Sequence, residues 1–347
     1  MTGKVRQRQV LTLEDKNVQT RKTILIAAST VVAAIVIGAL VFAASPSRHD
    51  PAEFKVLRDA HTRVDATAGK DEVRFAVYGD VENTRLALRE ILREVRKDGK
   101  YDFTLCAGDI VSGASDDHYE SFCNELLDRN TGTPMLFAVG NEDEAGATTP
   151  VRSALYEKYF GATHYSFAAA NTLFVTLDNA AHGKIASEEV AWLENLLKSE
   201  RSKYKALIVF MHKPPYDNRG AGMHHAMGRE QGERLLDLLK KYDVTAIFCG
   251  HIHSYYEWNR DGVPVYVSGG GGAWAPLGVI PNHHFLEVKV KNGIVAVTMH
   301  RIWDFSMICF LLLPVALVLI IALIAIKAYR RGWFRFLRPR LSKSNQK

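Results

Sequence analysis

The sequence predicts an α/β fold, a four-layer αββα sandwich of two mixed β-sheets with helices outside, flanked by two transmembrane helices. Short runs of β-branched, aromatic and aliphatic residues alternate with amphipathic segments, as is typical of strands and helices in α/β proteins. Asp-Gly and Asn-Gly pairs near the C-terminal end predict hairpins, so the sheets are expected to be mixed. Two uncharged apolar stretches near the ends of the chain predict the spans.

The apolar stretches cover 24–44 and 307–326. At about 1.5 Å per helical residue, each is long enough to cross the roughly 30 Å hydrocarbon core of a bilayer. A cleaved signal peptide is the alternative for the first stretch, although its apolar run exceeds the ~7–15 residues of a typical signal-peptide core. Either interpretation places the domain that follows outside the cytoplasm.

Positive charge at the two ends predicts the orientation. The tails 1–23 and 327–347 carry +4 and +8, whereas the whole chain carries +6, so the region between the tails is acidic. By the positive-inside rule both tails are cytoplasmic, which predicts an integral membrane protein with two spans and an extracytoplasmic domain. The acidic balance of that domain argues against a nucleic-acid partner.

Residues 45–72 are polar with no sustained period, which suits a stalk, and the domain is expected at 73–302. Its first half alternates short apolar runs with amphipathic segments, such as 84–97, whose apolar residues recur at three- and four-residue spacing. The elements expected in this half are, in order, strand 73–78, helix 84–97, strand 102–106, helix 117–129, strand 134–139 and helix 151–160.

The second half of the domain adds further strands, helices and two hairpins. Ser187 is expected to cap a helix, because acidic residues follow it in what would be the first turn. The remaining elements expected are, in order, a strand pair at 164–178, the helix after Ser187, strand 206–211, helix 229–241, strand 244–249 and hairpins that turn at 261–262 and 292–293.

Six polar side chains lie at or just beyond the ends of five of these apolar runs. Because ligands gather at the carboxyl ends of strands in an open α/β sheet, we expect the six to converge on one edge of one sheet. Imidazoles suit Zn, Mn or Fe, and carboxylate and amide oxygens suit harder ions, so the set predicts a metal site. The six residues are Asp80, Asp109, Asn141, His212, His251 and His253.

The segments around these residues resemble the five motifs of the calcineurin-like metallophosphoesterases. GDVEN, AGDIVSG, VGNED, FMHKPP and CGHIHS follow one another in the order and approximate spacing of that family, over about residues 73–255. The resemblance implies hydrolysis of phosphomonoesters or phosphodiesters by a metal-bound hydroxide in a dinuclear site. Its two ions would be divalent or of mixed valence: Mn, Fe or Zn.

By matching positions, the resemblance implies that Asp109 bridges the two ions and is central to catalysis. The remaining ligands divide between the ions. Metal one would be held by Asp80, Asp109 and His253, and metal two by Asp109, Asn141, His212 and His251.

Two residues depart from the family pattern. Glu82 stands where a His is usual, and either adds an oxygen ligand that favours a harder ion or points to solvent. Glu142 also replaces a His that usually serves the substrate phosphate or leaving group. If ionised, Glu142 repels a phosphate; if protonated, it can donate a proton to the leaving group; a third reading is weak or lost catalysis.

Lys213 is a weaker candidate for contact with the phosphate, and the loop around His224 and His225 can reach over the site. The sequence thus predicts a membrane-anchored metallophosphoesterase that acts outside the cytoplasm on a phosphoester substrate, which tethering suggests is envelope- or lipid-linked. The alternative is a catalytically weak or inactive metal-binding sensor domain of the same fold.

Overall fold

The computed structural model divides the chain into two units, of which Pro46–Met307 holds every described strand and the other combines Met1–Ser45 with Ile308–Lys347. The predicted first span, 24–44, lies outside the described residues apart from Thr30, as do both tails up to 23 and beyond 330. The structure describes residue 30 and residues 46–58, 60–64, 70–82, 85–129, 132–145, 153–180, 183–220, 225–273 and 282–330, with the backbone alone at 305–311, 313 and 329–330.

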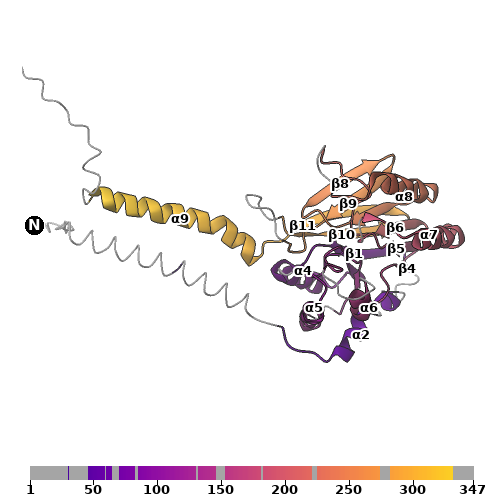
Figure 1. Ribbon diagram of the computed structural model, residues 1–347, viewed down its shortest axis with the longest axis horizontal. Helices are drawn as coiled ribbons and strands as arrows, with labels where there is room; N and C mark the ends of the chain where they lie inside the picture. Colours follow the sequence, from indigo (N-terminus) through magenta and orange to yellow (C-terminus); the bar gives the residue numbers. More distant parts are fainter. Residues whose placement is uncertain are drawn as a thin grey trace, which may run out of the picture. The chain divides into compact units, whose positions relative to one another are not determined.

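Two mixed sheets form the centre of the unit Pro46–Met307 (Figure 1). The first sheet has the strand order β11-β10-β1-β2-β3, and the second has the order β4-β5-β6-β7-β9-β8. The strands are β1 Glu72–Tyr78, β2 Phe103–Cys106, β3 Met135–Phe137, β4 Tyr165–Ala169, β5 Thr172–Thr176, β6 Ala206–Phe210, β7 Ala246–Cys249, β8 Tyr255–Arg260, β9 Val263–Ser268, β10 His284–Lys291 and β11 Ile294–Arg301.

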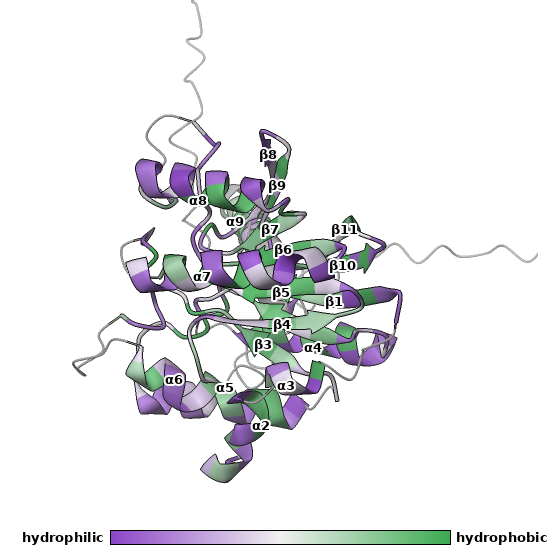
Figure 2. Ribbon diagram, turned by 90° about the vertical axis from the view of Figure 1, so that its right-hand side faces the viewer, coloured by the Kyte–Doolittle hydropathy of each residue, from purple (hydrophilic) through white to green (hydrophobic). Residues whose placement is uncertain are grey.

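Helices cover the outer face of each sheet, which confirms the predicted αββα layers. One buried cluster joins α4 and α5 to β1, and another joins α7 and α8 to β6. The central strands such as β5 are apolar, and the helices carry both apolar and polar residues, as Figure 2 shows. The longer helices are α4 Arg85–Asp98, α5 Asp116–Arg129, α6 Ala154–Phe160, α7 Ser187–Glu200 and α8 Arg229–Lys241.

A third cluster fills the space between the sheets and is dominated by phenylalanines. The ring of Phe75 in β1 lies 4.7 Å from that of Phe103 in the neighbouring strand. It also meets Phe174, Phe210 and Phe248 of the opposite sheet edge-on, with centroids 5.4 to 6.1 Å apart. All five side chains are fully buried, so this contact fixes the two sheets against each other.

Both predicted hairpins form, and each belongs to a different sheet. The β8–β9 turn has positive φ at Asp261 and Gly262, and the β10–β11 turn has it at Asn292 and Gly293. Such pairs suit the tight turns that match the twist of the strands. The helix expected at Ser187 does begin there, but its N-cap position is Ala186.

The segment expected as a stalk is instead helical in part. It forms η1 Pro51–Phe54, α2 Lys55–Arg58 and α3 Ala60–Val64. Phe54, Leu57, Ala60 and Val64 are buried, because their spacing of three, three and four residues places them on one helical face. The prediction of a stalk at 45–72 therefore does not hold for 51–64, which packs on the domain.

The C-terminal helix α9 covers Phe305–Arg330 and contains Pro314. Large apolar side chains described along it, from Leu312 to Ile326, are exposed. Taken over the residues that the structure describes in full, no helix is long and apolar enough to cross a membrane.

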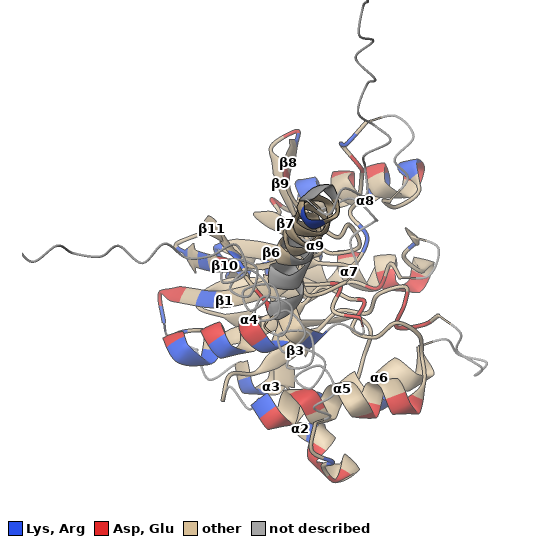
Figure 3. Ribbon diagram, turned by 90° about the vertical axis from the view of Figure 1, so that its left-hand side faces the viewer, with Lys and Arg blue, Asp and Glu red and all other residues tan. Residues whose placement is uncertain are grey.

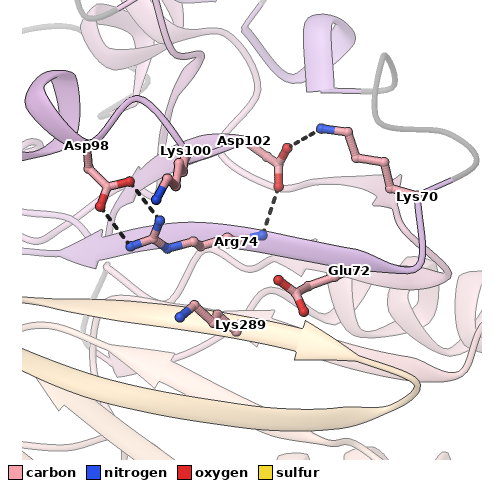
Figure 4. Close-up of a pocket in the computed structure, with 7 residues that line it drawn as sticks. All are labelled: Lys70, Glu72, Arg74, Asp98, Lys100, Asp102 and Lys289. Carbon is pink, nitrogen blue, oxygen red and sulfur yellow. Dashed lines mark hydrogen bonds and ion pairs between the residues drawn. The ribbon is translucent and has the colours of Figure 1, made fainter.

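Charged residues are interspersed over α4 and the nearby strand ends (Figure 3). A cavity of about 450 Å³ lies here, at the amino ends of β1 and β2, and its lining is entirely charged (Figure 4). Arg74 contacts Asp98 at 2.7 Å, and Lys70 contacts Asp102 at 2.8 Å. Arg74 also reaches Glu287 of β10 at 2.9 Å. These ion pairs tie the loop before β2 and strand β10 to β1.

The pH dependence of the stability of a Glu287→Gln variant tests this network of ion pairs. Burial raises the pKa of Glu287, but hydrogen bonds from Arg74 and Lys289 outweigh burial and hold it at about 2. Since the folded-state pKa lies below the ordinary value, the carboxylate stabilises the fold above about pH 4.5, and this contribution is lost as the pH falls towards 2. Urea unfolding should show a larger loss in the variant at pH 7 than at pH 3. The exposed control Glu257→Gln should show no such difference, and an equal loss at both pH values would refute the prediction.

Candidate metal centre

The six predicted donor residues follow strands of both sheets. Asp80, Asp109 and Asn141 follow β1, β2 and β3, whereas His212 follows β6 and the two histidines His251 and His253 follow β7. The expectation that the six side chains converge on one edge of one sheet is therefore wrong. The parallel strands of both sheets end on the same side of the sandwich, and the donor residues meet there. The backbone N–H of His251 bridges the sheets, because it donates to both carboxylate oxygens of Asp80 at 2.9 Å.

Three of the donors surround one atom of a fourth, Nε2 of His212. It lies 3.1 Å from Oδ2 of Asp109, 3.1 Å from Oδ1 of Asn141 and 3.2 Å from Nδ1 of His251. Asp109, His212 and His251 offer ligand atoms that all lie within 4.8 Å of one another. With Asn141 added, these residues are the complete set that the family resemblance implies for metal two.

The tautomer of His212 follows from its second nitrogen. Nδ1 lies 2.9 Å from the carbonyl oxygen of Ala107, which can only accept, so Nδ1 carries a hydrogen. Nε2 is then free to bind a cation, as in metal-ligating histidines whose other nitrogen donates to a carbonyl. In the metal-free protein a proton takes that place: burial lowers the pKa of His212, but Asp109 outweighs burial and raises it to about 9.

The neighbouring groups also fit a cation. Burial and the nearby His212 lower the pKa of His251 to about 3, so its imidazole is neutral and can act as a ligand. Burial raises the pKa of Asp109, but His212 and the N–H of Glu142 outweigh it, so this carboxylate is ionised at neutral pH. Once a cation displaces the proton of His212, two imidazole nitrogens, one carboxylate and one amide oxygen form a donor set for a borderline divalent ion.

The residues expected around metal one lie beside this set. Nε2 of His253 is 3.6 Å from Oδ1 of Asp80 and 3.5 Å from Oε1 of Glu82. Glu82 thus faces the site, and its side chain is only 17% exposed. Burial, with the charge of Asp109, raises the pKa of Asp80 to about 7, and burial raises that of Glu82. A cation here would stabilise both carboxylates in their ionised form.

The backbone is strained at these positions. Asp80, Glu82, Asp109 and His251 have φ of 60°, 48°, 52° and 70°, a region that non-glycine residues rarely adopt. Such strain persists where surrounding contacts determine the conformation, and it clusters at functional sites. At Gly140, a Cβ atom would collide with the backbone of Asp109, so only glycine lets the second and third motifs meet.

Glu142 contacts the site through both its backbone and its side chain. Its N–H donates to Oδ1 of Asp109 at 2.8 Å, and its Oε1 accepts from Nδ2 of Asn141 at 2.9 Å. The second bond turns the amide of Asn141 so that its oxygen faces His212. The glutamate therefore orients a proposed metal ligand, whichever part it takes in catalysis.

The sequence analysis missed Asp143, a fully buried carboxylate. It accepts the N–H groups of Ile110, Val111 and Gly140 at 2.8 to 3.0 Å, and its own carbonyl accepts from Tyr119. Asp143 thus ties the loop that carries Asp109 to the loop that carries Asn141. Its place directly after VGNE was the available signal, since an acid beside a predicted ligand can support the site.

The weaker candidates are also near the site where they are described. The ring of His225 lies 5.7 Å from that of His251, while His224 lies outside the described residues. Lys213 is half-buried beside His212, and burial lowers its pKa despite the charges of Asp109 and Glu142. The cysteines described, Cys106, Cys123 and Cys249, are free and buried, and so act as small core residues.

The chain is similar in sequence to curated phosphatases and phosphodiesterases. Purple acid phosphatase 21 of Arabidopsis thaliana is 28% identical over 215 residues, which cover 57% of this chain and 46% of that protein. A probable glycerophosphodiester phosphodiesterase, GpdQ of Arcobacter nitrofigilis, is 30% identical over 178 residues, which cover 46% of this chain and 60% of that protein. The chain thus spans about half the length of these curated relatives.

A solved structure shares the fold. The purple acid phosphatase PPD1 from yellow lupin (Lupinus luteus) seeds superposes with a TM-score of 0.54 at 17% identity, over 68% of this chain and 53% of that one. The calcineurin-like phosphoesterase family matches residues 73–255, more than half of the chain, and so covers all seven predicted ligands. The chain therefore belongs to the calcineurin-like phosphoesterase family.

Proposed function

We propose that the chain is a metal-dependent phosphoesterase that hydrolyses phosphomonoesters or phosphodiesters. The observation that carries this proposal is the meeting of Asp109, Asn141 and His251 at 3.1 to 3.2 Å around Nε2 of His212. Membership of the family supports it, as do relatives named as phosphatases and phosphodiesterases.

We propose that the donors divide between two ions as the family pattern implies. Asp109, Asn141, His212 and His251 would hold one ion. Asp80, Glu82 and His253 would hold the second with Asp109 as the bridge, and with three carboxylates this position would favour a harder ion such as iron. Two such ions, when bound, supply an activated water and neutralise charge on the phosphoryl oxygens.

Side chains around the ions serve the substrate. Lys213 directly follows His212 and interacts electrostatically with Asp109, and we assign it contact with the substrate phosphate. His225, whose ring faces His251, can pass a proton to the leaving oxygen. Glu142 contacts Asn141, and a negative charge on its side chain would oppose a phosphate dianion.

We further propose that α9 anchors the chain in a membrane and that the domain acts outside the cytoplasm. Its described apolar side chains are exposed, Trp303 just before it is 57% exposed, and the tail that follows is rich in Lys and Arg. Exposed aliphatic surface on a helix is stable in lipid, and Trp is common at the interface. Such anchoring would hold the domain close to envelope- or lipid-linked phosphoesters, and we propose these as its substrates.

A metal-binding sensor domain without turnover is the second candidate. Glutamate at 82 and 142, where the family usually has histidine, favours it. The two functions separate in one assay of the purified full chain loaded with Mn²⁺, using p-nitrophenyl phosphate and bis-p-nitrophenyl phosphate. Hydrolysis of either substrate supports the phosphoesterase. Bound metal with hydrolysis of neither substrate supports the sensor.

Asp109→Ala should lower the metal content of the purified chain from about two ions to one or none, because it removes the bridging carboxylate. The measurement is elemental analysis after dialysis against Mn²⁺ and removal of free ion. The control Asp117→Ala changes an exposed aspartate at the start of α5 and should leave the content unchanged. Two ions retained in Asp109→Ala would contradict the assignment of the bridge.

Glu142→His should raise kcat on p-nitrophenyl phosphate by about tenfold or more, since it removes a repelling charge and adds a proton donor. Glu142→Gln is the matched variant that removes the charge alone, and it should give a smaller gain. An unchanged or lower kcat in Glu142→His would show that this side chain does not act where the usual histidine acts.

A further inference from the structure

We propose that Asn179 is a positioning residue that fixes the directions of two neighbouring side chains, His212 and Lys213. The roles of those two rest on the proposed function. Asn179 lies just after β5, the strand that runs parallel to β6, and β6 leads into His212. Its side chain is fully buried.

Among the described residues, the side-chain amide of Asn179 hydrogen-bonds to the backbone of these two. Its Oδ1 accepts the N–H of His212 at 3.1 Å and the N–H of Lys213 at 3.0 Å. Its Nδ2 donates to the carbonyl oxygen of Lys213 at 2.6 Å. The two N–H groups require an acceptor and the carbonyl requires a donor, so the orientation of the amide is determined.

These bonds mark the point where the chain leaves the sheet. Within β6 the backbone pairs in turn with the strands on either side: Leu177 donates to Phe210, and Met211 donates to Phe248. Successive N–H groups of a strand point in opposite directions, so one oxygen can accept from both His212 and Lys213 only where the strand has ended. Asn179 replaces the neighbouring strand at this turn and fixes its shape.

The turn places two functional groups at once. The carbonyl oxygen of His212 accepts from Gly250, whose neighbour His251 is another proposed ligand, so the His212 backbone is held from two sides. Its imidazole then reaches Asp109, and the ammonium group of Lys213 stays near the same carboxylate. Asn179 thereby couples the geometry of a metal ligand to that of the cation assigned to the phosphate. Outer partners of this kind commonly change metal affinity by about 10- to 100-fold when removed.

The test measures Mn²⁺ binding to the full chain by titration calorimetry, with thermal unfolding of the metal-free protein recorded in parallel. Asn179→Ala should weaken Mn²⁺ binding by about tenfold or more and change the visible absorption spectrum of the Co²⁺-loaded protein. Asn124→Ala is the matched control, because Asn124 is also buried and accepts one backbone N–H, from His49, in a different part of the domain. It should lower the Tm but keep Mn²⁺ affinity within about twofold of wild type.

Asn179→Asp is the second variant, in case the alanine variant does not fold. It keeps the oxygen that accepts from His212 and Lys213 and loses the bond donated to Lys213, so it should keep most Mn²⁺ affinity but raise KM for p-nitrophenyl phosphate. Wild-type affinity and spectrum in Asn179→Ala, or an equal loss of affinity in Asn124→Ala, would overturn the proposal. If the wild-type chain itself bound no Mn²⁺, the proposed function would fail together with it.

Discussion

The site depends on one interaction, the bond from Nδ1 of His212 to the carbonyl oxygen of Ala107. It fixes the tautomer and aims Nε2 at three acceptor atoms that otherwise have no reason to share a buried space. Buried acceptors that face one another require a donor or a cation among them. A proton on Nε2 fills that role in the metal-free protein and a metal ion can replace it, which is why the geometry points to metal binding more strongly than any single residue does.

The two edges of the β1 sheet use charge in opposite ways. At the amino edge, Arg74 is paired with carboxylates on both sides, and the cavity there is lined by mutually compensated charges. At the carboxyl edge, Asp80, Asp109 and Glu82 gather with strained backbone and with too few cations for their charge. Stability is therefore supplied away from the site, by the ion pairs and by the phenylalanine core between the sheets.

Local pattern was sufficient to predict most of the fold and to pick out the side chains that meet at the candidate site. The expected strands, helices and hairpins all form among the described residues, because apolar period and Asx-Gly turns act over a few residues. The sequence could not show that the site is built from two sheets, because no local signal indicates that His212 and Asp80 follow strands of different sheets. The helices at 51–64 were missed because polar residues are interspersed among the four buried apolar residues, which lie at helical spacing. Asp143 and Asn179 act on backbone groups distant in the chain, and only coordinates reveal such partners.

The most direct test is a crystal structure of the purified chain grown with Mn²⁺, with an anomalous difference map to locate the ions. The dinuclear site predicts two peaks about 3.5–4 Å apart, one bound by Asp109, Asn141, His212 and His251 and the other by Asp80, Glu82, Asp109 and His253. A map with no peak at these residues, or with manganese bound only elsewhere, would contradict the assignment of a metal centre.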